Sequence, residues 1–287
     1  MKFSIIIPTL NRPEAVKNTI QNLFNQDFGD FEIIIIDQSS DEYVKKDWPN
    51  DRRIIYKHVE FRNVARAKNI GIDKAKGEII FFCDDDVHIA DPLFLTKMLT
   101  AFNEAGIDCV VPRIIPLRHN ILGVIRERRI NSIKKCGYIR WFDRRPISNW
   151  DNTASGFVAH AAGVVAYRRQ AVKAVKYFDE EFGKGHAYLE DTDFSLRAKS
   201  FGFRPYFFSK IYLYHLKMPT GGCRVFKKES YRYWFCRNYR RYIKRHFPKF
   251  WPVAMVQQIL QELLYSILKG DPKTFKYSLK GILGMRS

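Results

Sequence analysis

The sequence predicts an α/β protein with a Rossmann-like arrangement, in which helices flank a mostly parallel sheet. In the first half of the chain, short runs of apolar and β-branched residues alternate with amphipathic stretches. The apolar runs show little polar alternation, which is typical of strands buried on both faces of a parallel sheet. A chain of 287 residues, of which 46% are hydrophobic, is long and apolar enough to bury such a core.

The individual elements follow from these patterns and from the residues that end them. FSIII at 3–7 is a β-branched run that ends at Pro8, and Pro13 then favours the start of a helix. Gly77 and Gly106 each follow an amphipathic stretch, where a glycine favours the end of a helix. We expect strands at 3–7, 31–36, 53–59, 78–83, 109–111, 163–168 and 205–215, and helices at 13–26, 63–76, 91–105, 170–177, 190–201 and from 227 onward.

Charge is distributed unevenly along the chain. Residues 1–112 hold 14 lysines and arginines against 18 acidic residues, a net charge of −4. Residues 113–287 hold 35 against 12, a net charge of +23, and the stretch 113–150 is basic and irregular. The two parts therefore face different partners, or one partner with two ends.

Cysteine usage and hydropathy favour a cytoplasmic protein. The five cysteines form no CxxC pair and are odd in number, which argues against a disulfide framework and for a reducing compartment. The apolar run in MKFSIIIPTLNRPE is too short for a signal peptide, and no uninterrupted apolar stretch of about 18 residues occurs. We therefore expect no membrane-spanning helix.

Acidic and polar residues follow several of the predicted strands. Pro8 and Thr9 close the first strand, Asp37 follows the second, and the triplet Asp84–Asp86 follows the fourth. In an open parallel sheet, ligands bind beyond the carboxyl ends of the strands. Three adjacent carboxylates favour a divalent cation such as Mg²⁺ or Mn²⁺, although a solvated turn or a helix cap is an equally good interpretation. No GxxxxGK[ST] or GxGxxG motif occurs, which argues against P-loop and dinucleotide-binding chemistry.

A second acidic cluster, Glu190–Asp193, lies at the start of a predicted helix. Acids in a first helical turn are stabilised by the helix dipole, so a capping role is the simpler interpretation. A positioned carboxylate could also serve as a general base for a sugar hydroxyl. His215 follows a strand, where a histidine is structural unless the sheet brings it to the metal ligands.

The order of the motifs resembles a known family. Along the chain stand SIIIPTLNRPE, IIIIDQSSDE, NVARAKNIGIDKAKGEIIFFCDDDV, GVVAYRR, FDEEFGKG and LEDTDFSLRAKSFGF. Together they closely resemble the family 2 inverting glycosyltransferases, which have the GT-A fold and include bacterial enzymes of cell-surface glycan synthesis. The resemblance covers about residues 2–215. Each motif is weak alone, but their shared order and spacing are specific.

This resemblance implies a domain organisation. A GT-A catalytic domain would occupy 1–220, with a nucleotide-sugar half at 1–112 and an acceptor half at 113–220. Residues 221–287 would form a basic, aromatic, helical C-terminal extension.

The resemblance also implies roles for single residues. Asp191 would be the catalytic base, and Asp84, Asp86 and His215 would hold Mn²⁺ or Mg²⁺. Asp37 would read the edge of a pyrimidine ring. The donor would be bound by Pro8, Thr9, Asn11, Arg12, Asp37, Arg66, Lys68, Asn69, Asp84 and Asp85, and the acceptor side would include Gly163, Arg168 and Glu190.

The chain departs from the family pattern in two places. Lys68 stands where arginine is usual, and Arg66 lies two residues earlier. Ser39 stands where glycine is usual, which leaves the conformation of that loop open.

The stretch 224–249 holds ten lysines and arginines and one acidic residue, interleaved with aromatic residues. This pattern suits a nucleic-acid-binding stripe, a helix on anionic lipid, or a helical cap with solvated charges. Its segment RNYRRYIKRHFP resembles an ending seen in several bacterial sugar transferases of this family. We expect the apolar face of 253–268 to be buried against the domain rather than inserted in lipid, or else shared with a second subunit.

Together, these observations predict a metal-dependent inverting glycosyltransferase. It would move a sugar from a nucleotide-diphosphate donor, with UDP- or dTDP-sugars favoured, to a hydroxyl of a glycan or lipid-linked acceptor in surface polysaccharide assembly. We expect it in the cytoplasm or peripherally on the inner face of the cell membrane, in contact with anionic lipid. The alternative is an inactive GT-A-like binding module or a basic nucleic-acid-binding protein, and we consider nucleic acid the weaker partner.

Overall fold

The computed structural model describes residues 1–42, 48–104, 106–120, 123–126, 136–218, 220–222 and 228–285. The basic residues Arg128, Arg129, Lys134 and Lys135 lie outside these ranges, and so does the start of the basic stretch at 224–227.

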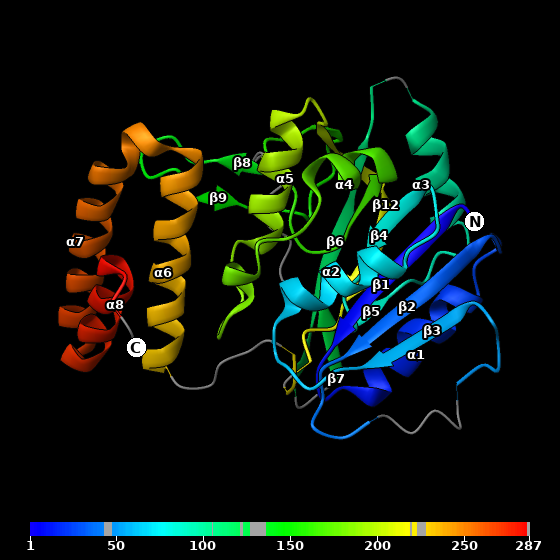
Figure 1. The fold of residues 1–287 in the computed structure, drawn as a ribbon, viewed down its shortest axis with the longest axis horizontal. Helices are drawn as coiled ribbons and strands as arrows, with labels where there is room; N and C mark the ends of the chain where they lie inside the picture. The colour runs from blue at the N-terminus through cyan, green and yellow to red at the C-terminus, as the bar shows by residue number, and fades with distance from the viewer. Residues whose placement is uncertain are drawn as a thin grey trace.

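The core of the fold is a mixed β-sheet flanked by helices, as predicted (Figure 1). Its main path runs in the order β10-β12-β6-β11-β4-β1-β2-β3, and β5 and β7 pair at its margins. The strands β3, β2, β1 and β4 are parallel, whereas β11 is antiparallel to both of its neighbours. The strands are β1 (Phe3–Thr9), β2 (Phe31–Asp37), β3 (Ile54–His58), β4 (Ile79–Phe82), β5 (Val87–His88), β6 (Cys109–Asn120), β7 (Gly123–Arg126), β10 (Gly156–Phe157), β11 (Val165–Arg168) and β12 (Pro205–His215), and β8 (Tyr138–Ile139) and β9 (Pro146–Ile147) form a separate hairpin.

Helices cover both faces of the sheet. One face is packed by α1 (Pro13–Phe24) and α3 (Phe94–Asn103), and the other by α2 (Val64–Lys74), α4 (Arg169–Val175) and α5 (Glu190–Ser200). Strands buried on both faces explain why their sequences are almost continuously apolar. All residues of β1 and β2 are buried, including Glu32, which accepts a hydrogen bond from Ser4.

The structure is more regular than expected in the basic segment 113–150. Strand β6 does not end at Val111 but continues to Asn120, because residues 113–116 pair with 212–215 of β12 after a register shift. The prolines at 112 and 116 had concealed this strand, since proline lacks the N–H group that a central strand needs.

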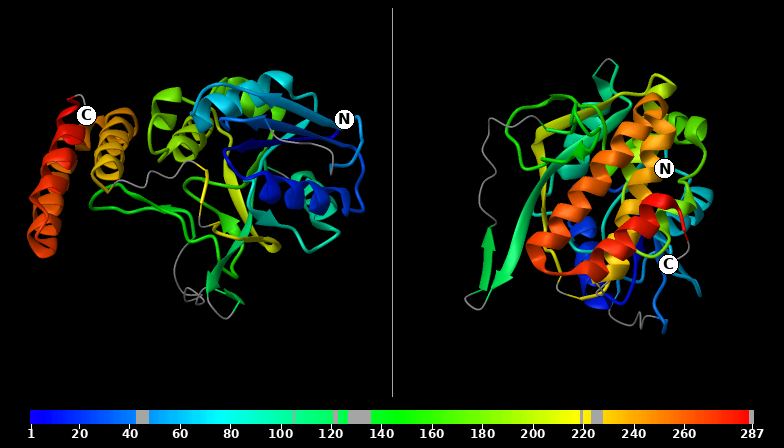
Figure 2. Two further views of the ribbon diagram at one scale, coloured as in Figure 1. Left: turned by 90° about the horizontal axis from the view of Figure 1, so that it is seen from below. Right: turned by 90° about the vertical axis from the view of Figure 1, so that its left-hand side faces the viewer.

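The C-terminal part forms a separate helical layer. Helices α6 (Lys228–His246), α7 (Trp251–Lys269) and α8 (Pro272–Leu283) share a small apolar core, and the short helix η2 (Pro248–Phe250) joins the first two. This core also includes Phe182 and Leu189 of the part that contains the sheet, so α6 lies between that part and the outer helices α7 and α8 (Figure 2). Among the described residues, no helix is both long and apolar enough to cross a bilayer.

One prediction about this layer is wrong. The apolar residues at 253–268 are not buried against the domain, because α7 turns its opposite, polar face inward. Ile267 is 67% exposed, whereas Glu262 of the same helix is 2% exposed.

Candidate active site

Three candidate metal ligands meet at the carboxyl edge of the sheet. Asp84 and Asp86 follow β4, and His215 ends β12, which is parallel to β6 and is joined to β5 beside this edge. One ligand atom from each of the three residues lies within 4.8 Å of the others. The Nε2 atom of His215 is 3.1 Å from a carboxylate oxygen of Asp86 and 3.9 Å from one of Asp84. The sheet therefore brings these three predicted residues together. Two carboxylate oxygens and one imidazole nitrogen form a donor set that fits a divalent cation.

Charges around the triplet differ from residue to residue. Burial alone would raise the pKa of Asp86, but the neighbouring His215 and Arg12 lower this pKa to about 2. The carboxylate of Asp86 therefore stays ionised. Burial raises the pKa of Asp85 to about 6, against the opposing positive charge of Arg12. Asp85 is 4% exposed and accepts hydrogen bonds from Thr9 at 2.7 Å and from Arg12 at 2.8 Å. Asp85 therefore holds the end of β1 in place.

Arg12 connects the triplet with the loop after β12. Its guanidinium contacts Asp85 and Asp86, and it donates to the carbonyl oxygens of Thr220 and Gly221. A side chain on Gly222 would collide with this guanidinium, and both Gly221 and Gly222 have positive φ angles. These two glycines are required for the close approach of the loop, and the pair of glycines after β12 was a signal that our sequence analysis missed.

Ser39, the residue after β2 that departs from the family pattern, holds the loop after β1 in place. The Oγ atom of Ser39 accepts a hydrogen bond of 2.7 Å from the backbone N–H of Asn11. Asn11 has a φ angle of +55°, a conformation that asparagine tolerates better than most residues. The serine hydroxyl therefore stabilises the loop that carries Asn11.

Asp37 is fully buried at the end of β2. One of its oxygens accepts from the Tyr56 hydroxyl at 2.7 Å, and the other accepts from the Ser39 N–H at 2.9 Å. The neighbouring Gln38 lines the cleft instead. Recognition of a pyrimidine by Asp37 stays a prediction.

The second acidic cluster, at the start of α5, lies close to the acidic triplet, since the charges of Lys68 and Asp191 both act on Asp84. The Nζ atom of Lys68 donates to Asp191 and lies 3.9 Å from Glu190, and the N–H of Gly163 donates to the other oxygen of Asp191 at 3.0 Å. Burial alone would lower the pKa of Lys68, but the two carboxylates raise it above its usual value, so the ammonium stays charged. Burial and the Asp191 charge raise the pKa of Glu190. The structure thus brings together four predicted residues, Lys68, Gly163, Glu190 and Asp191. Lys68 and Asp191 are more than 120 positions apart in the sequence.

Three predicted site residues are placed elsewhere. Arg168 lies opposite Ile79, at the start of β4, because β11 is antiparallel to β4, so its expected position on the acceptor side is wrong. Arg66 is exposed on α2 and lies over the Phe61 ring. The amide of Asn69 is bonded to the backbone of Phe178, so it supports the segment before α5 rather than lining the cleft.

Beside the acidic triplet and His215 lies a cleft of about 460 Å³, a size that suits a small-molecule ligand. Of the predicted residues, it is lined by Pro8, Thr9, Asn11, Arg12, Asp84, Asp85, Asp86 and His215. It is also lined by residues that our sequence analysis did not assign, namely Leu10, Gln38, Arg62, Asn63, Val64, Gly183, Gly185, Gly221 and Gly222.

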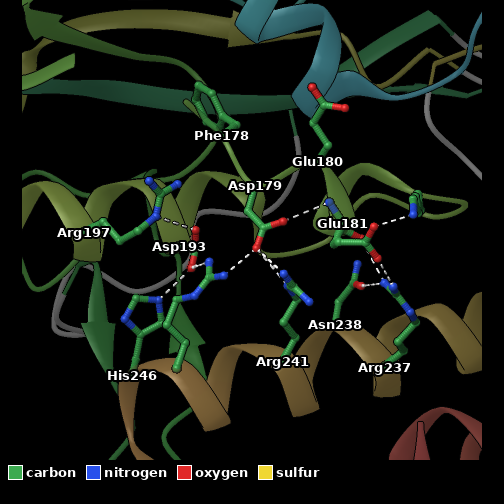
Figure 3. A network of polar contacts seen from close by, with 12 residues as sticks. Phe178, Asp179, Glu180, Glu181, Asp193, Arg197, Arg237, Asn238, Arg241 and His246 are labelled. Atoms are coloured by element: carbon green, nitrogen blue, oxygen red, sulfur yellow. Dashed lines mark hydrogen bonds and ion pairs between the residues drawn. The ribbon is translucent and has the colours of Figure 1, made fainter. Parts of the chain in front are cut away.

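Helix α6 holds the segment 179–193, which leads from the cleft into α5 (Figure 3). Arg237 forms an ion pair with Glu181, and the buried amide of Asn238 donates to the carbonyl oxygens of Phe182, His186 and Tyr188 at 3.0, 3.4 and 3.3 Å. A side chain on Gly185 at the cleft would collide with Trp234. The helix therefore shapes one wall of the cleft.

Further along α6, basic residues reach two buried or half-buried carboxylates (Figure 3). Arg241 and Arg245 contact Asp179 at 2.7 and 2.6 Å, and Arg245 also reaches Asp193 at 2.7 Å. His246 lies 2.9 Å from Asp193. Asp193 thus faces α6, whereas Asp191, two residues earlier, contacts Lys68 and Gly163.

These contacts change the interpretation of the basic stretch. Its tyrosines 239 and 242 are buried, as expected for a helical cap, but the charges of Arg237, Arg241 and Arg245 are paired with acids rather than solvated. Paired guanidinium groups are poorly placed to bind nucleic-acid phosphates, which removes the main support for that alternative.

Comparisons with known proteins agree with this geometry. Among curated proteins, the chain is similar to the GalNAc(5)-diNAcBac-PP-undecaprenol beta-1,3-glucosyltransferase of Campylobacter jejuni, with 34% identity over 106 residues, which are 35% of this chain and 34% of that protein. It is also similar to the amylovoran biosynthesis glycosyltransferase AmsB of Erwinia amylovora, with 25% identity over 71% of this chain and 66% of that protein. The chain therefore matches about a third of the length of the first of these relatives.

Solved structures share the fold. Residues 1–349 of Staphylococcus aureus TarS align with 99% of this chain and 92% of that chain, at a TM-score of 0.58 and 18% identity. The mannosyltransferase PcManGT from Pyrobaculum calidifontis, solved with GDP-Man and Mn²⁺, aligns with 98% of this chain and 73% of that chain, at a TM-score of 0.57 and 14% identity. At these identities, the likeness shows the GT-A fold.

Family membership rests on the sequence itself. The sequence profile described as Glycosyl transferase family 2 matches residues 4–176, which is more than half of the chain. The matched range includes β1, α2 and the acidic triplet after β4, the elements that build most of the cleft. The chain belongs to Glycosyl transferase family 2.

Proposed function

We propose that the protein is an inverting glycosyltransferase that moves a sugar from a nucleotide-diphosphate donor to a hydroxyl group of an acceptor. One observation supports this most strongly: Asp84, Asp86 and His215 lie within ligand distance of one another, and the carboxylate of Asp191, from a separate element, is near enough for its charge to act on Asp84. Lys68 connects the two groups electrostatically, since its charge is felt by both Asp191 and Asp84.

Asp191 acts as the base in this proposal. Lys68 and the Gly163 N–H each occupy one of its oxygens, and each carboxylate oxygen can still accept a second hydrogen bond. The acceptor hydroxyl gives its proton to Asp191 while its oxygen forms a bond to the anomeric carbon. The bond between that carbon and the diphosphate oxygen breaks on the opposite side, and the nucleoside diphosphate leaves with the electron pair. Attack from the opposite side inverts the configuration.

Asp84, Asp86 and His215 would hold the divalent cation, and the imidazole ligand favours Mn²⁺ over Mg²⁺. When bound, this cation supplies positive charge beside the leaving diphosphate. Among the cleft residues, Arg62 provides a further cation that is exposed at the rim. The held position of Arg12 supports the acidic triplet rather than the donor itself.

The proposed donor and acceptor follow those named for similar proteins. A pyrimidine donor, UDP- or dTDP-linked, agrees with the solved TarS complex with UDP-GlcNAc. A lipid-linked acceptor agrees with the undecaprenol-linked substrate named for the Campylobacter jejuni relative. We therefore place the reaction at a membrane surface, in the assembly of a surface glycan, with the C-terminal helices 221–287 as an extension of a catalytic domain at 1–220.

Thermal unfolding with a panel of nucleoside diphosphates, with and without Mn²⁺, tests the donor site. We expect a stabilisation by one nucleotide that requires Mn²⁺. The Asp86→Ala variant should lose the metal-dependent part of this shift, whereas Asp30→Ala, at the opposite edge of the sheet, should keep it. A full metal-dependent shift in Asp86→Ala would exclude Asp86 as a ligand.

Turnover tests the base. We expect Asp191→Asn to lower the rate of transfer by at least about 100-fold while the nucleotide shift is retained, because general-base catalysis commonly contributes that much. An unchanged rate would remove Asp191 from this role.

A further inference from the structure

Helix α7 exposes its apolar face and buries its polar face, the reverse of an ordinary surface helix. Its apolar side chains recur at spacings of three and four residues, which places them on one face of the helix. That face is turned to solvent, and its members are Val253, Val256, Leu260, Leu263, Leu264, Ile267 and Leu268, which are 51, 58, 60, 40, 57, 67 and 74% exposed. We call these seven residues the α7 outer face. Exposed apolar side chains are common singly, but a contiguous stripe of seven indicates a binding surface.

The opposite face of α7 explains why the apolar residues remain outside. Glu262 is 2% exposed and accepts hydrogen bonds from Arg232 of α6, from Ser278 of α8 at 2.8 Å and from Gln258 at 2.7 Å. Rotating the helix to bury its leucines would separate this buried carboxylate from its donors, at a large desolvation cost. The outward orientation is therefore specified by the chain, and it is not a failure of packing.

Lysines lie around this face. Lys249 precedes α7, Lys269 ends it, and Lys273 and Lys276 lie in the first turns of α8, all four exposed. The acidic residues of this region are Glu262 on α7 and Asp271 between α7 and α8. Both form ion pairs, Glu262 with Arg232 and Asp271 with Lys228. The segments before and after α7 are therefore positively charged.

We propose that the α7 outer face binds the surface of an anionic lipid bilayer, with α7 lying in the plane of the interface. This inference rests on the proposed lipid-linked acceptor and names the surface that would bring the cleft to it. Apolar side chains would enter the boundary between headgroups and acyl chains, and the lysines would contact anionic headgroups.

Charge and helix length favour lipid over other occupants. A two-fold contact between copies would bring the same lysines together, so like charges would oppose it. The polar stripe of Gln258, Glu262 and Ser266 makes α7 unsuitable as a spanning helix but suitable as a helix that lies on a surface. Helix α6 connects this surface with the cleft, because its Trp234 lies against Gly185.

Sedimentation of the full chain with vesicles tests the proposal. One set of vesicles contains phosphatidylcholine alone, and the other contains equal parts of phosphatidylcholine and phosphatidylglycerol. We expect binding to the anionic vesicles that weakens with salt. The triple variant L260S/L264S/I267S should bind them at least about tenfold more weakly, because three buried apolar side chains are lost. The matched control Phe201→Ser, an exposed apolar residue at the end of α5, should bind like the wild type.

Three results would overturn the proposal: no binding of the wild type to either vesicle, equal binding of the triple variant, or a wild-type dimer that the triple variant converts to a monomer without any binding to vesicles. Sedimentation equilibrium without lipid distinguishes the last case. The nucleotide-dependent thermal shift, measured on the same samples without vesicles, separates this test from that of the proposed function. A triple variant that keeps the nucleotide-dependent thermal shift but no longer binds anionic vesicles would support both the proposed function and the proposed lipid-binding face.

Discussion

Helices α6 and α7 are neighbours that depart from the ordinary surface helix in opposite ways. Helix α6 is strongly basic, yet Arg237, Arg241 and Arg245 point to acids of the catalytic part. Helix α7 has the sequence of a core helix, yet its leucines are exposed and its glutamate is buried. Periodicity defined the apolar face of α7 correctly. It did not define what each face contacts, because that depends on charges and surfaces contributed from distant parts of the chain.

The largest effect on stability is expected at the carboxylate that joins α6 to α5. Asp193 is fully buried and contacts Arg197, Arg245 and His246. Replacing it by asparagine leaves these cations without their common partner, and we expect a loss of about 3 kcal/mol in the free energy of unfolding. Urea unfolding checks this, with Asp73→Asn on the exposed side of α2 as the control. Equal stability of the two variants would show that α6 is held by its apolar contacts alone.

The pH dependence of this effect sharpens the same comparison. Burial alone would raise the pKa of Asp193, but His246, Arg197 and Arg245 outweigh it and hold the pKa below its usual range. A carboxylate with a lowered native pKa stabilises the fold above its unfolded pKa of about 3.9, and this contribution is lost as the pH falls through the native pKa. The difference in stability between the wild type and Asp193→Asn should therefore be constant above about pH 5 and decrease in stronger acid. A difference that grows in acid would contradict the ion-pair explanation.

A matched pair of substitutions tests whether α7 buries its polar face and exposes its apolar face. Glu262→Gln and Leu264→Gln introduce the same side chain two residues apart. We expect the first to lower the free energy of unfolding by about 2 kcal/mol, because it weakens a buried charge-assisted network. In an ordinary amphipathic helix the order would be reversed.

The smallest expected effect is that of Leu264→Gln itself. This side chain is 57% exposed, so its replacement should change the free energy of unfolding by less than about 0.5 kcal/mol. Thermal unfolding of the isolated protein measures this change. A loss as large as that of Glu262→Gln would mean that the α7 outer face is covered in solution.

Much of the fold and part of the candidate site could be predicted from the sequence. The apolar strands and the acidic residues after the fourth strand were predicted because each pattern is local, whereas a metal-binding role for His215 was implied only by the resemblance to the family. Arg168 was misplaced because the antiparallel direction of β11 is not visible in its own residues. Gly221 and Gly222 were missed because their function depends on Arg12, more than 200 residues earlier.

The sequence by itself therefore determined the α/β class, the family and the residue types at the cleft, since these depend on short-range periodicity and on motif order. Only the tertiary structure decided which basic residue each carboxylate contacts. Asp191 and Asp193 are two residues apart in the same helical turn, so they point in different directions, one to Lys68 and the other to α6. The same applies to α7: its two faces are set by helical geometry, but the buried partners of Glu262 decided that the apolar face would remain outside.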